Sequence, residues 1–117
     1  MKLLLTIVTQ PQQSIEEAQE LGNLLLNELG ENTIIQSIEP YSKFESAFAI
    51  NLEKILPDSN TATIIHQCIA LADEIVSPWL TYYDNDLEKI ELIYNHSEQT
   101  QTRKNTFNQI KWAQIIY

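Results

Sequence analysis

Cysteine, glycine and arginine are scarce in this sequence, which contains one cysteine, two glycines and a single arginine. The lone cysteine, Cys68, cannot form a disulfide within the chain, so nothing indicates an oxidising compartment. With only two glycines and four prolines among 117 residues, the chain does not have the composition of a linker or a low-complexity tail. We therefore expect a single α+β domain over residues 1–117 that buries its own hydrophobic core.

Long hydrophobic runs are also missing. No stretch approaches the roughly 20 apolar residues that a membrane helix needs. The apolar run after Lys2 has only about seven residues, too few for a convincing signal peptide. Gln10, Pro11 and Gln12 follow that run in place of the small residues of a cleavage site. The sequence thus predicts a cytoplasmic protein that has no contact with a membrane.

Basic residues are few, with 7 against 16 acidic residues and a formal net charge of -9. A surface this negative repels nucleic-acid phosphate and anionic lipid, and it attracts basic proteins over a range that salt screening sets. The imbalance is concentrated in the first 98 residues, because Arg103, Lys104 and Lys111 all follow the last acid, Glu98. We expect no direct nucleic-acid binding. Solubility alone is the competing explanation of the charge.

Motifs for catalysis and for metal binding are missing as well. His66 and Cys68 stand two residues apart on a predicted helix, and His96 lies in a distant loop, so these side chains do not have metal-ligand spacing. Cys68 falls within an apolar stripe, which is typical of a core residue and not of a nucleophile. There is no glycine-rich phosphate loop. We predict no catalytic residue, no metal site and no cofactor.

The best-defined elements are an N-terminal strand and the helix that follows it. Residues 2–9 are apolar or β-branched on both faces, which predicts an interior strand. Ser14 and Glu17 have the spacing of a capping box, apolar residues then recur at helical spacing, and Gly30 supplies a left-handed stop, so residues 15–29 are predicted to be a helix. Gly22 lies in its buried stripe, where we expect close packing against the sheet.

Further elements are less sharply delimited. Residues 33–39 predict a strand with Ile34 and Ile38 on one face, and a period of two from Phe44 to Glu53 predicts its hairpin partner. A second helix is predicted from about residue 61 and ends by Pro78, with its buried stripe formed by Ile65, Cys68, Ile69, Ala72, Ile75 and Val76.

Two more strands are predicted on either side of a polar loop. Residues 87–94 form the first, and residues 95–105 form an exposed and mobile loop. Residues 107–117 form the second, with Ile110, Trp112 and Ile116 on one face. The resulting order predicts a ferredoxin-like split βαβ sandwich, βαββαβ, with an extra C-terminal antiparallel strand.

One segment combines aromatic and acidic side chains. Residues 79–86 read Trp-Leu-Thr-Tyr-Tyr-Asp-Asn-Asp, and further acids follow in the next five positions. Half-buried aromatics beside hydrated acids are typical of a hot spot that faces a basic protein. The structural alternative is that Trp79 and one tyrosine cover the end of the helix layer. The candidate partner-binding residues are Trp79, Tyr82, Tyr83, Asp84, Asp86, Glu88 and Glu91.

A small, acidic, cysteine-poor chain with such a segment resembles bacterial immunity proteins, in particular those of contact-dependent growth inhibition systems. Tyr82-Tyr83-Asp84 is also similar to the paired tyrosines with nearby acids through which colicin DNase immunity proteins bind their toxins. Those proteins are helical bundles, whereas this chain is predicted to be rich in strands. The resemblance implies stoichiometric binding of a toxin C-terminal domain, often a basic nuclease, and inhibition without enzymatic activity.

Other functions remain open from sequence alone. The runner-up is a dimeric ferredoxin-like domain that binds or responds to a small molecule and pairs through its exposed final strand. A third hypothesis is a small enzyme that uses His66 or a tyrosine. Mimicry of nucleic acid by the acidic surface is a variant of the toxin-binding hypothesis. Should the aromatic segment not bind the partner, Glu16, Glu17 and Glu20 on the first helix are the second choice.

Overall fold

In the computed structural model, which describes all residues from 1 to 117, β1 (Lys2–Thr9) lies inside a six-stranded antiparallel sheet. Its neighbours are β3 (Phe48–Ile55) and β8 (Ile110–Ile116). The predicted interior position of this strand is confirmed. Leu3, Leu5 and Ile7 are buried on the helix side, whereas on the other side burial is uneven: Val8 is buried and Leu4 is 50% exposed.

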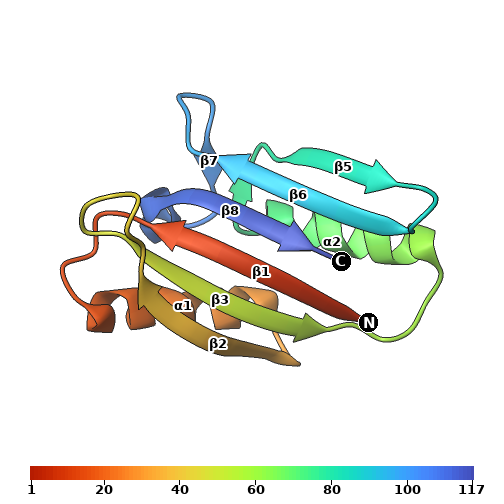
Figure 1. The fold of residues 1–117 in the computed structure, drawn as a ribbon, viewed down its shortest axis with the longest axis horizontal. Helices are drawn as coiled ribbons and strands as arrows, with labels where there is room; N and C mark the ends of the chain where they lie inside the picture. Colours follow the sequence, from red (N-terminus) through yellow and green to blue (C-terminus); the bar gives the residue numbers. More distant parts are fainter.

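The remaining strands extend the sheet on both sides (Figure 1). β2 (Thr33–Pro40) lies outside β3, β6 (Lys89–Asn95) lies outside β8, and β5 (Leu80–Asp84) pairs with β6. The strand order is β2-β3-β1-β8-β6-β5, so β2 and β5 are the two edges. A separate two-stranded sheet joins β4 (Val76–Ser77) to β7 (Gln101–Thr102).

The helices α1 (Ile15–Leu29) and α2 (Thr61–Asp73) cover the same face of the sheet (Figure 1). A short 3-10 helix, η1 (Asn105–Gln109), precedes β8. The α+β class is therefore confirmed, and the sheet with two helices is compatible with a ferredoxin-like fold. The other face of the sheet carries no helix, and we call it the open face. Neither α1 nor α2 has the length and apolar character needed to cross a membrane.

The bounds of α1 agree with the prediction, and its caps explain them. The Ser14 side chain accepts a hydrogen bond from the backbone N–H of Glu17, as a capping box requires. The Glu17 carboxylate closes the turn by accepting from the backbone N–H of Gln13. At the other end Gly30 has φ 79°, a left-handed conformation that glycine adopts without steric cost.

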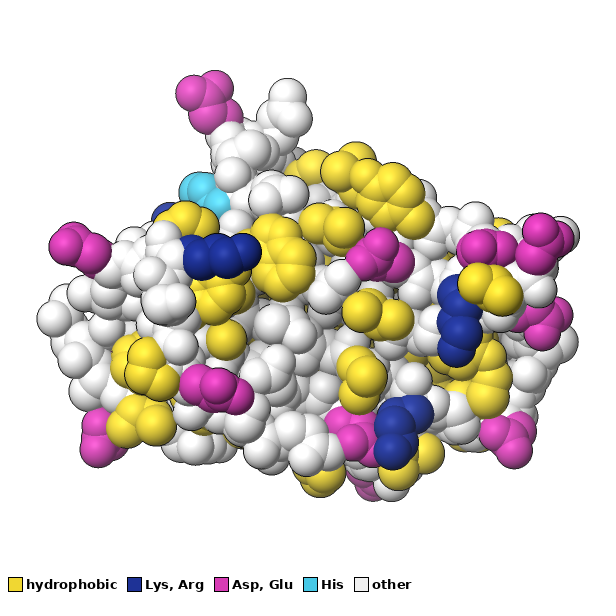
Figure 2. Space-filling model, viewed as in Figure 1, with side chains coloured by type: hydrophobic (Ala, Val, Ile, Leu, Met, Phe, Trp, Pro, Cys, Tyr) yellow, Lys and Arg dark blue, Asp and Glu magenta, His cyan; other side chains and the backbone are white.

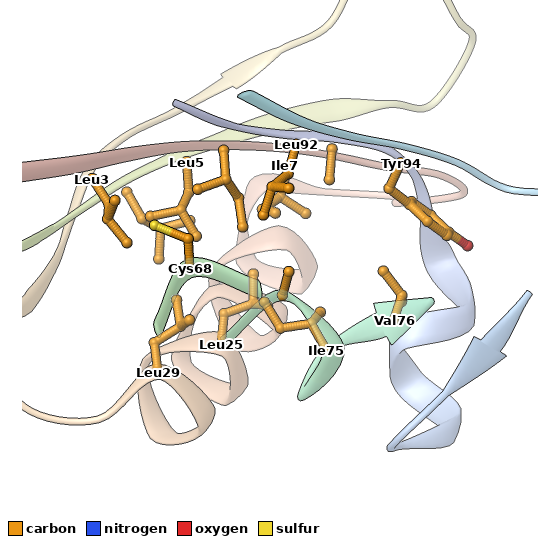
Figure 3. Packing of buried hydrophobic residues seen from close by; sticks show 14 of the residues in the cluster. Leu3, Leu5, Ile7, Leu25, Leu29, Cys68, Ile75, Val76, Leu92 and Tyr94 are labelled. Carbon is orange, nitrogen blue, oxygen red and sulfur yellow. The ribbon is translucent and has the colours of Figure 1, made fainter. Parts of the chain in front are cut away.

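The hydrophobic core lies between the sheet and the two helices. Leu3, Leu5 and Ile7 point from β1 toward α1 and α2, where Leu25 and Cys68 face them (Figure 3). Alternation along β1 sends every second side chain into this layer, and the 3.6-residue period of α1 returns Leu21, Leu25 and Leu29 to it. The sheet therefore has one buried face and one face free for other contacts.

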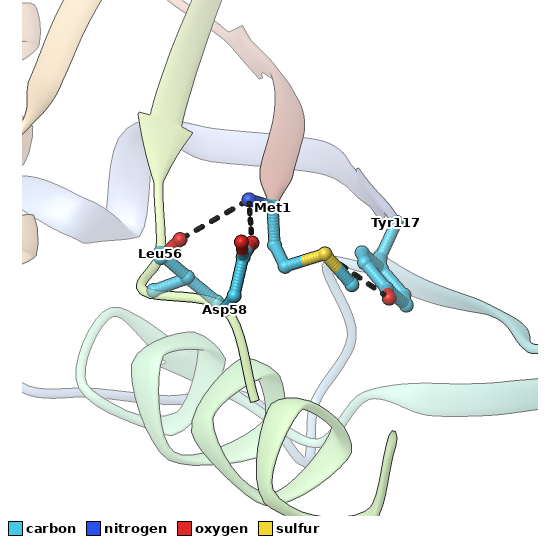
Figure 4. Close-up of polar contacts among 4 residues, drawn as sticks. All are labelled: Met1, Leu56, Asp58 and Tyr117. Carbon is cyan, nitrogen blue, oxygen red and sulfur yellow. Dashed lines mark hydrogen bonds and ion pairs between the residues drawn. The ribbon is translucent and has the colours of Figure 1, made fainter. Parts of the chain in front are cut away.

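The chain ends meet at one end of β1. The Met1 amino group donates hydrogen bonds to the carbonyl oxygen of Leu56 at 3.2 Å and to the Asp58 carboxylate at 3.3 Å (Figure 4). The Tyr117 hydroxyl reaches the Met1 sulfur at 3.7 Å. These contacts hold β1, β3 and β8 together at this end of the sheet.

The prediction that the C-terminal strand is an added edge strand was wrong. β8 pairs with β1 on one side and with β6 on the other, so neither edge is free to join a second copy. The strand predicted over residues 87–94 is β6, and it is separated from β1 by β8. Local sequence does not distinguish these arrangements, because both strands carry a buried apolar face.

Two β-bulges overturn two predicted faces. The register between β2 and β3 shifts between Ile35 and Ser37, so Ile38 joins Ile35 on the core side and Ile34 is left on the open face. The register between β1 and β8 shifts at Val8 and Thr9, which places Ile110 in the core and separates it from Trp112. Each bulge adds one residue and so inverts the alternation beyond it.

Other element bounds also differ from the prediction. β8 begins at Ile110 and not at residue 107, because residues 105–109 form η1, and β6 spans Lys89–Asn95 in place of 87–94. β3 begins at Phe48, because residues 41–47 form the loop after β2 and Ser46 has φ 52°. α2 ends at Asp73, and its buried stripe is Ile64, Cys68 and Ala72, with Ile69 exposed. The polar segment 95–105 contains β7, so it is not a loop throughout.

Candidate functional site

The aromatic and acidic segment forms the exposed edge hairpin of β5 and β6. All five residues of β5 are exposed. The Asp84 carboxylate accepts hydrogen bonds from the backbone N–H groups of Asp86 and Leu87, at 3.0 and 3.1 Å. This contact is an Asx turn, in which a side chain replaces a backbone acceptor. Asp84 therefore shapes the turn in addition to contributing charge.

Strand alternation separates the two adjacent tyrosines. Tyr82 pairs with Glu91, whereas Tyr83 pairs with the buried Ile90. Directly paired residues project from the same face of a sheet, so Tyr82 lies on the open face and Tyr83 on the helix side. Their side chains are 53% and 44% exposed. The two rings therefore cannot both lie against one flat partner surface.

Four of the seven predicted residues line one hollow of about 430 Å³ at the end of the hairpin. We call it the Tyr82 hollow; its lining residues are Tyr82, Tyr83, Asp84, Lys89, Ile90, Glu91 and Ile116. The Glu91 carboxylate accepts a hydrogen bond from the Gln114 amide and makes no ion pair. A half-exposed aromatic ring thus stands beside a carboxylate that forms no ion pair, although Lys89 lines the same hollow.

The Tyr82 hollow lies at the end of a row of side chains that crosses the whole open face. The strand registers align, in order, Ile34, Glu53, Leu4, Ile116, Glu91 and Tyr82. Both acids of this row lie between apolar neighbours. Glu53 is neutralised by Lys2 at 3.1 Å, whereas Glu91 has no cation within ion-pair distance. The uncompensated charge of the row is therefore at its Tyr82 end.

Figure 2 shows the same face, with hydrophobic side chains spread across it and most acidic side chains toward its rim. The large apolar residues exposed along the row include Ile34 at 55% and Ile116 at 40%. An antiparallel sheet with one solvated face normally places polar side chains there, so apolar exposure on this face indicates a contact surface.

The other predicted residues are not brought into the hollow. Asp86 and Glu88 are exposed in the turn between β5 and β6 and form no ion pair. Trp79 is half-buried on the helix side, where its ring lies 5.7 Å from that of Tyr94. Its indole N–H lies within hydrogen-bond distance of the carbonyl oxygens of Ala72 and Val76. Trp79 thus covers the end of the helix layer, as the structural alternative described.

Sequence reasoning missed Ile116 and Lys89 in the Tyr82 hollow, and Leu4 and Ile34 in the row. Lys89 lies between the predicted acids Glu88 and Glu91 but was not among the candidate residues. Ile116 is about 25 residues further along the chain than Glu91, its neighbour across β6 and β8. No local signal could have placed it there, because strand pairing brings the two together.

The second-choice acids are found elsewhere. Glu17 and Glu20 line a separate hollow of about 360 Å³ beside α1, with Thr106 and Gln109 of the segment before β8. Glu16 is exposed in the first turn of α1 and does not line it. This hollow has two apolar lining residues, Leu21 and Leu24, and no exposed aromatic ring.

The candidates for catalysis occupy unlike environments. Cys68 is fully buried in the core, and burial raises the pKa of its thiol to about 11. A thiol with such a pKa is almost wholly protonated near neutrality and is a poor nucleophile. His66 and His96 are both exposed. No group of three or more His, Cys, Asp or Glu side chains is arranged to hold a metal ion.

Comparison with known proteins does not assign the chain to a family. No protein-family model matches the sequence, no curated protein matches it, and no solved structure matches the fold at a significant level.

Proposed function

We propose that this chain is an immunity protein that binds a basic toxin domain stoichiometrically through the open face, with the Tyr82 hollow as the centre of contact. The observation that carries the proposal is the pairing of Tyr82, 53% exposed, with the carboxylate of Glu91, which no cation neutralises. A tyrosine beside an acid can bury its ring against a partner while the acid receives a lysine or arginine.

Charge supports the same proposal. The chain has a net charge of -9, and Asp86 and Glu88 stand unpaired beside the hollow. Opposite charges accelerate the encounter of two proteins, and salt screens that attraction. A cytoplasmic location belongs to this proposal, since an immunity protein must meet the toxin where the toxin acts. The partner is a basic domain, for which a nuclease is the leading candidate class.

The first experiment is copurification of the tagged protein from its native host in low salt, followed by affinity measurement with the recovered domain. We expect a basic domain at a one-to-one ratio. Tyr82→Ala should weaken binding by about 2 kcal/mol, mainly through faster dissociation. Tyr83 also lines the hollow, but its ring projects from the opposite face of the sheet, so we expect Tyr83→Ala to weaken binding less than Tyr82→Ala. Loss of affinity in Tyr83→Ala but not in Tyr82→Ala would show that the partner binds the helix side and would contradict binding through the open face.

A second pair of variants tests the role of charge. Glu91→Gln removes the uncompensated carboxylate of the row, and we expect slower association and a weaker dependence on salt. Glu53→Gln is the control, because Lys2 already neutralises that acid in the same row. Equal effects of the two variants would mean that only net charge matters. That result would favour mimicry of nucleic acid by the acidic surface.

Binding of a small molecule is a second candidate function that one observation favours. The Tyr82 hollow measures about 430 Å³, within the range of about 300–1,000 Å³ that is usual for ligand sites. A thermal-shift screen of metabolites would test it. A saturable stabilisation that Tyr82→Ala abolishes would support this function over toxin binding.

For the topology we propose a split βαβ unit formed by β1, α1, β2, β3, α2 and β8. The order β2-β3-β1-β8 within the sheet supports this assignment. Residues 76–102, which include β5 and β6, would then be an insertion before β8, the last strand of the unit. In the sheet these added strands lie beyond β8, but in the sequence they precede it.

A further inference from the structure

The two edges of the sheet differ in how well they are protected against pairing. Exposed edge strands are usually blocked by proline, by charges or by bulges. β2 has all three, since a bulge follows Ile35, Glu39 is exposed near the end of the strand and Pro40 closes it. β5 reads Leu-Thr-Tyr-Tyr-Asp, pairs with β6 without a register shift and contains no proline, and its single charge, Asp84, stands at its end. The β5 edge is therefore the less protected one.

The hydrogen bonds of β6 identify which backbone groups of β5 point outward. The backbone N–H of Tyr117 donates to the carbonyl oxygen of Ile90, and that of His96 donates to the carbonyl oxygen of Lys111. Both contacts show that even-numbered residues of β6 direct their backbone groups toward β8. Backbone direction alternates along a strand, so Glu91 and Ile93 direct theirs toward β5.

The same alternation fixes the free edge. Glu91 pairs with Tyr82 and Ile93 pairs with Leu80, so these two residues of β5 direct their backbone groups inward to β6. Thr81 lies between Leu80 and Tyr82, and Tyr83 follows Tyr82. These two residues therefore direct their backbone N–H and C=O groups away from β6, toward the free edge. Both residues are exposed, and no backbone hydrogen bond outside the helices and strands involves either of them.

We propose that β5 pairs antiparallel with β5 of a second copy of this chain, about a two-fold axis at Tyr82. In that register Thr81 of one copy faces Tyr83 of the other, and the reverse pair is equivalent. These are the residues with outward backbone groups, so each pair exchanges both of its hydrogen bonds. The edge is thus self-complementary, as a two-fold interface requires.

Side chains on the helix side fit the same register. Tyr83 of one copy would stand opposite Thr81 of the other, at a cross-strand distance of about 5 Å between Cβ atoms. Thr81 borders a hollow of about 310 Å³ whose apolar lining includes Ile69, Trp79 and Leu92. The exposed Tyr83 ring therefore has an apolar site on the second copy, and the contact occurs twice in the dimer.

Charge is compatible with this register, although two acidic chains repel each other overall. Asp84 of one copy would lie beside Leu80 of the other, so no two acids of the strand are directly opposed. Leu80 is 58% exposed in the single chain. Because each chain has a net charge of -9, added salt should strengthen the dimer, whereas it should weaken a complex with a basic protein.

The inference does not depend on the proposed function. Pairing at the β5 edge extends the sheet within its plane and leaves the open face uncovered. Tyr82 of each copy would lie at the two-fold axis on that face. The Tyr82 hollow would then occur twice on one continuous surface.

Sedimentation velocity over a concentration series, at low and moderate salt, tests the proposal on the intact chain. We expect a reversible monomer–dimer equilibrium that salt strengthens. Thr81→Pro removes an outward N–H without removing a bond to β6, and it should weaken dimerisation at least about tenfold, because two hydrogen bonds are lost per dimer. Thr81→Val keeps the N–H and should dimerise like the wild type.

Two further measurements test the dimer if Thr81→Pro fails to fold. Tyr83→Ala should weaken the dimer, and the amide protons of Thr81 and Tyr83 should exchange more slowly as protein concentration rises. A chain that stays monomeric at millimolar concentration overturns the proposal. So does a dimer that survives both Thr81→Pro and Tyr83→Ala, or one that is lost in Leu4→Glu, because such a dimer would use the open face.

Discussion

The ammonium group of Lys54 in β3 donates a 2.6 Å hydrogen bond to the carbonyl oxygen of Leu29, the last residue of α1. It also donates to the carbonyl oxygen of Glu31 at 2.7 Å. The last turn of α1 contains no basic residue of its own, so a lysine from the sheet supplies the positive charge that a helix C-terminus favours. This contact fixes one end of α1 against the hairpin of β2 and β3.

Lys54→Met should lower the free energy of unfolding by about 2 kcal/mol or more, since two carbonyl oxygens near the core would lose their charged donor. Lys2→Met is the matched control: Lys2 pairs with Glu53 at the surface and its side chain is 61% exposed. Its removal should cost less than about 1 kcal/mol. Urea titration of the three proteins measures both effects. Equal losses would show that Lys54 is not a helix cap.

Cys68 should make the protein lose stability at alkaline pH. Burial raises the pKa of its thiol from 9.0 to about 11 in the folded state. Above pH 9 the folded state therefore binds more protons at Cys68 than the unfolded state does. The free energy of unfolding consequently falls as pH rises from 9 toward 11. Lys54 and Tyr94 also have pKa values shifted by burial, so the comparison is between wild type and Cys68→Ala.

Thermal unfolding of these two proteins from pH 7 to 11 is the measurement. We expect the wild type to lose on the order of 2 kcal/mol more than Cys68→Ala across this range. Parallel curves would mean that the thiol titrates alike in the folded and unfolded states. We also expect Cys68 to react slowly with a thiol reagent in the folded protein and faster in urea, because unfolding exposes the thiol.

Gly22 and Gly30 should respond differently to alanine. A Cβ at Gly22 would lie 2.9 Å from the Cδ1 of Ile35, which confirms the expected close packing of α1 on the sheet. The end of the Ile35 side chain can move, and helix propensity improves by about 1 kcal/mol, so Gly22→Ala should change stability by less than about 1 kcal/mol. Gly22→Leu should destabilise by about 2 kcal/mol or more, because its larger side chain would meet the sheet.

Gly30 lies in open space, with no heavy atom within 4 Å of an added Cβ, but its φ is 79°. Gly30→Ala should cost about 1 kcal/mol from backbone strain alone. Denaturant midpoints of the three variants separate a steric effect from a conformational one. A neutral Gly30→Ala would indicate that α1 can end without the left-handed residue.

Substitutions of Trp79 and Tyr82 should differ in their effect on the free energy of unfolding, because Trp79 packs on the core and Tyr82 is exposed. Trp79→Phe removes an indole N–H that lies near two carbonyl oxygens, and we expect a loss of about 1–2 kcal/mol. Tyr82→Ala should stay within about 0.5 kcal/mol of wild type, because its ring contributes little to the core. Chemical denaturation followed by circular dichroism measures both. A large loss in Tyr82→Ala would make its effect on partner binding uninterpretable.

Local patterns predicted the elements whose signals lie within a few residues. The Ser14 cap, the Gly30 stop and the 3.6-residue period defined α1 to the residue. β1 was found from a run of apolar and β-branched residues on both faces, and β6 from apolar residues on one face. The errors at Ile38 and Ile110 arose from bulges, which depend on how a partner strand pairs and not on the strand itself.

The candidate site was predictable in part. The segment from Tyr82 to Glu91 was identified from its composition, and the structure brings Tyr82, Tyr83, Asp84 and Glu91 to one hollow. Trp79 does not share this surface, because its indole contacts the end of α2 and β4 and its ring packs against the core.

Composition and short-range periodicity in the sequence were sufficient to predict the acidic charge, the first helix, the interior character of β1 and the aromatic and acidic segment. Strand pairing in the fold was needed to show that this segment contains an edge strand, β5, that β8 lies inside the sheet, and that Leu4, Ile34 and Ile116 share a row with Tyr82. Strand order and register bring together residues far apart in the chain, and the hydrophobic pattern of one strand is compatible with several neighbours.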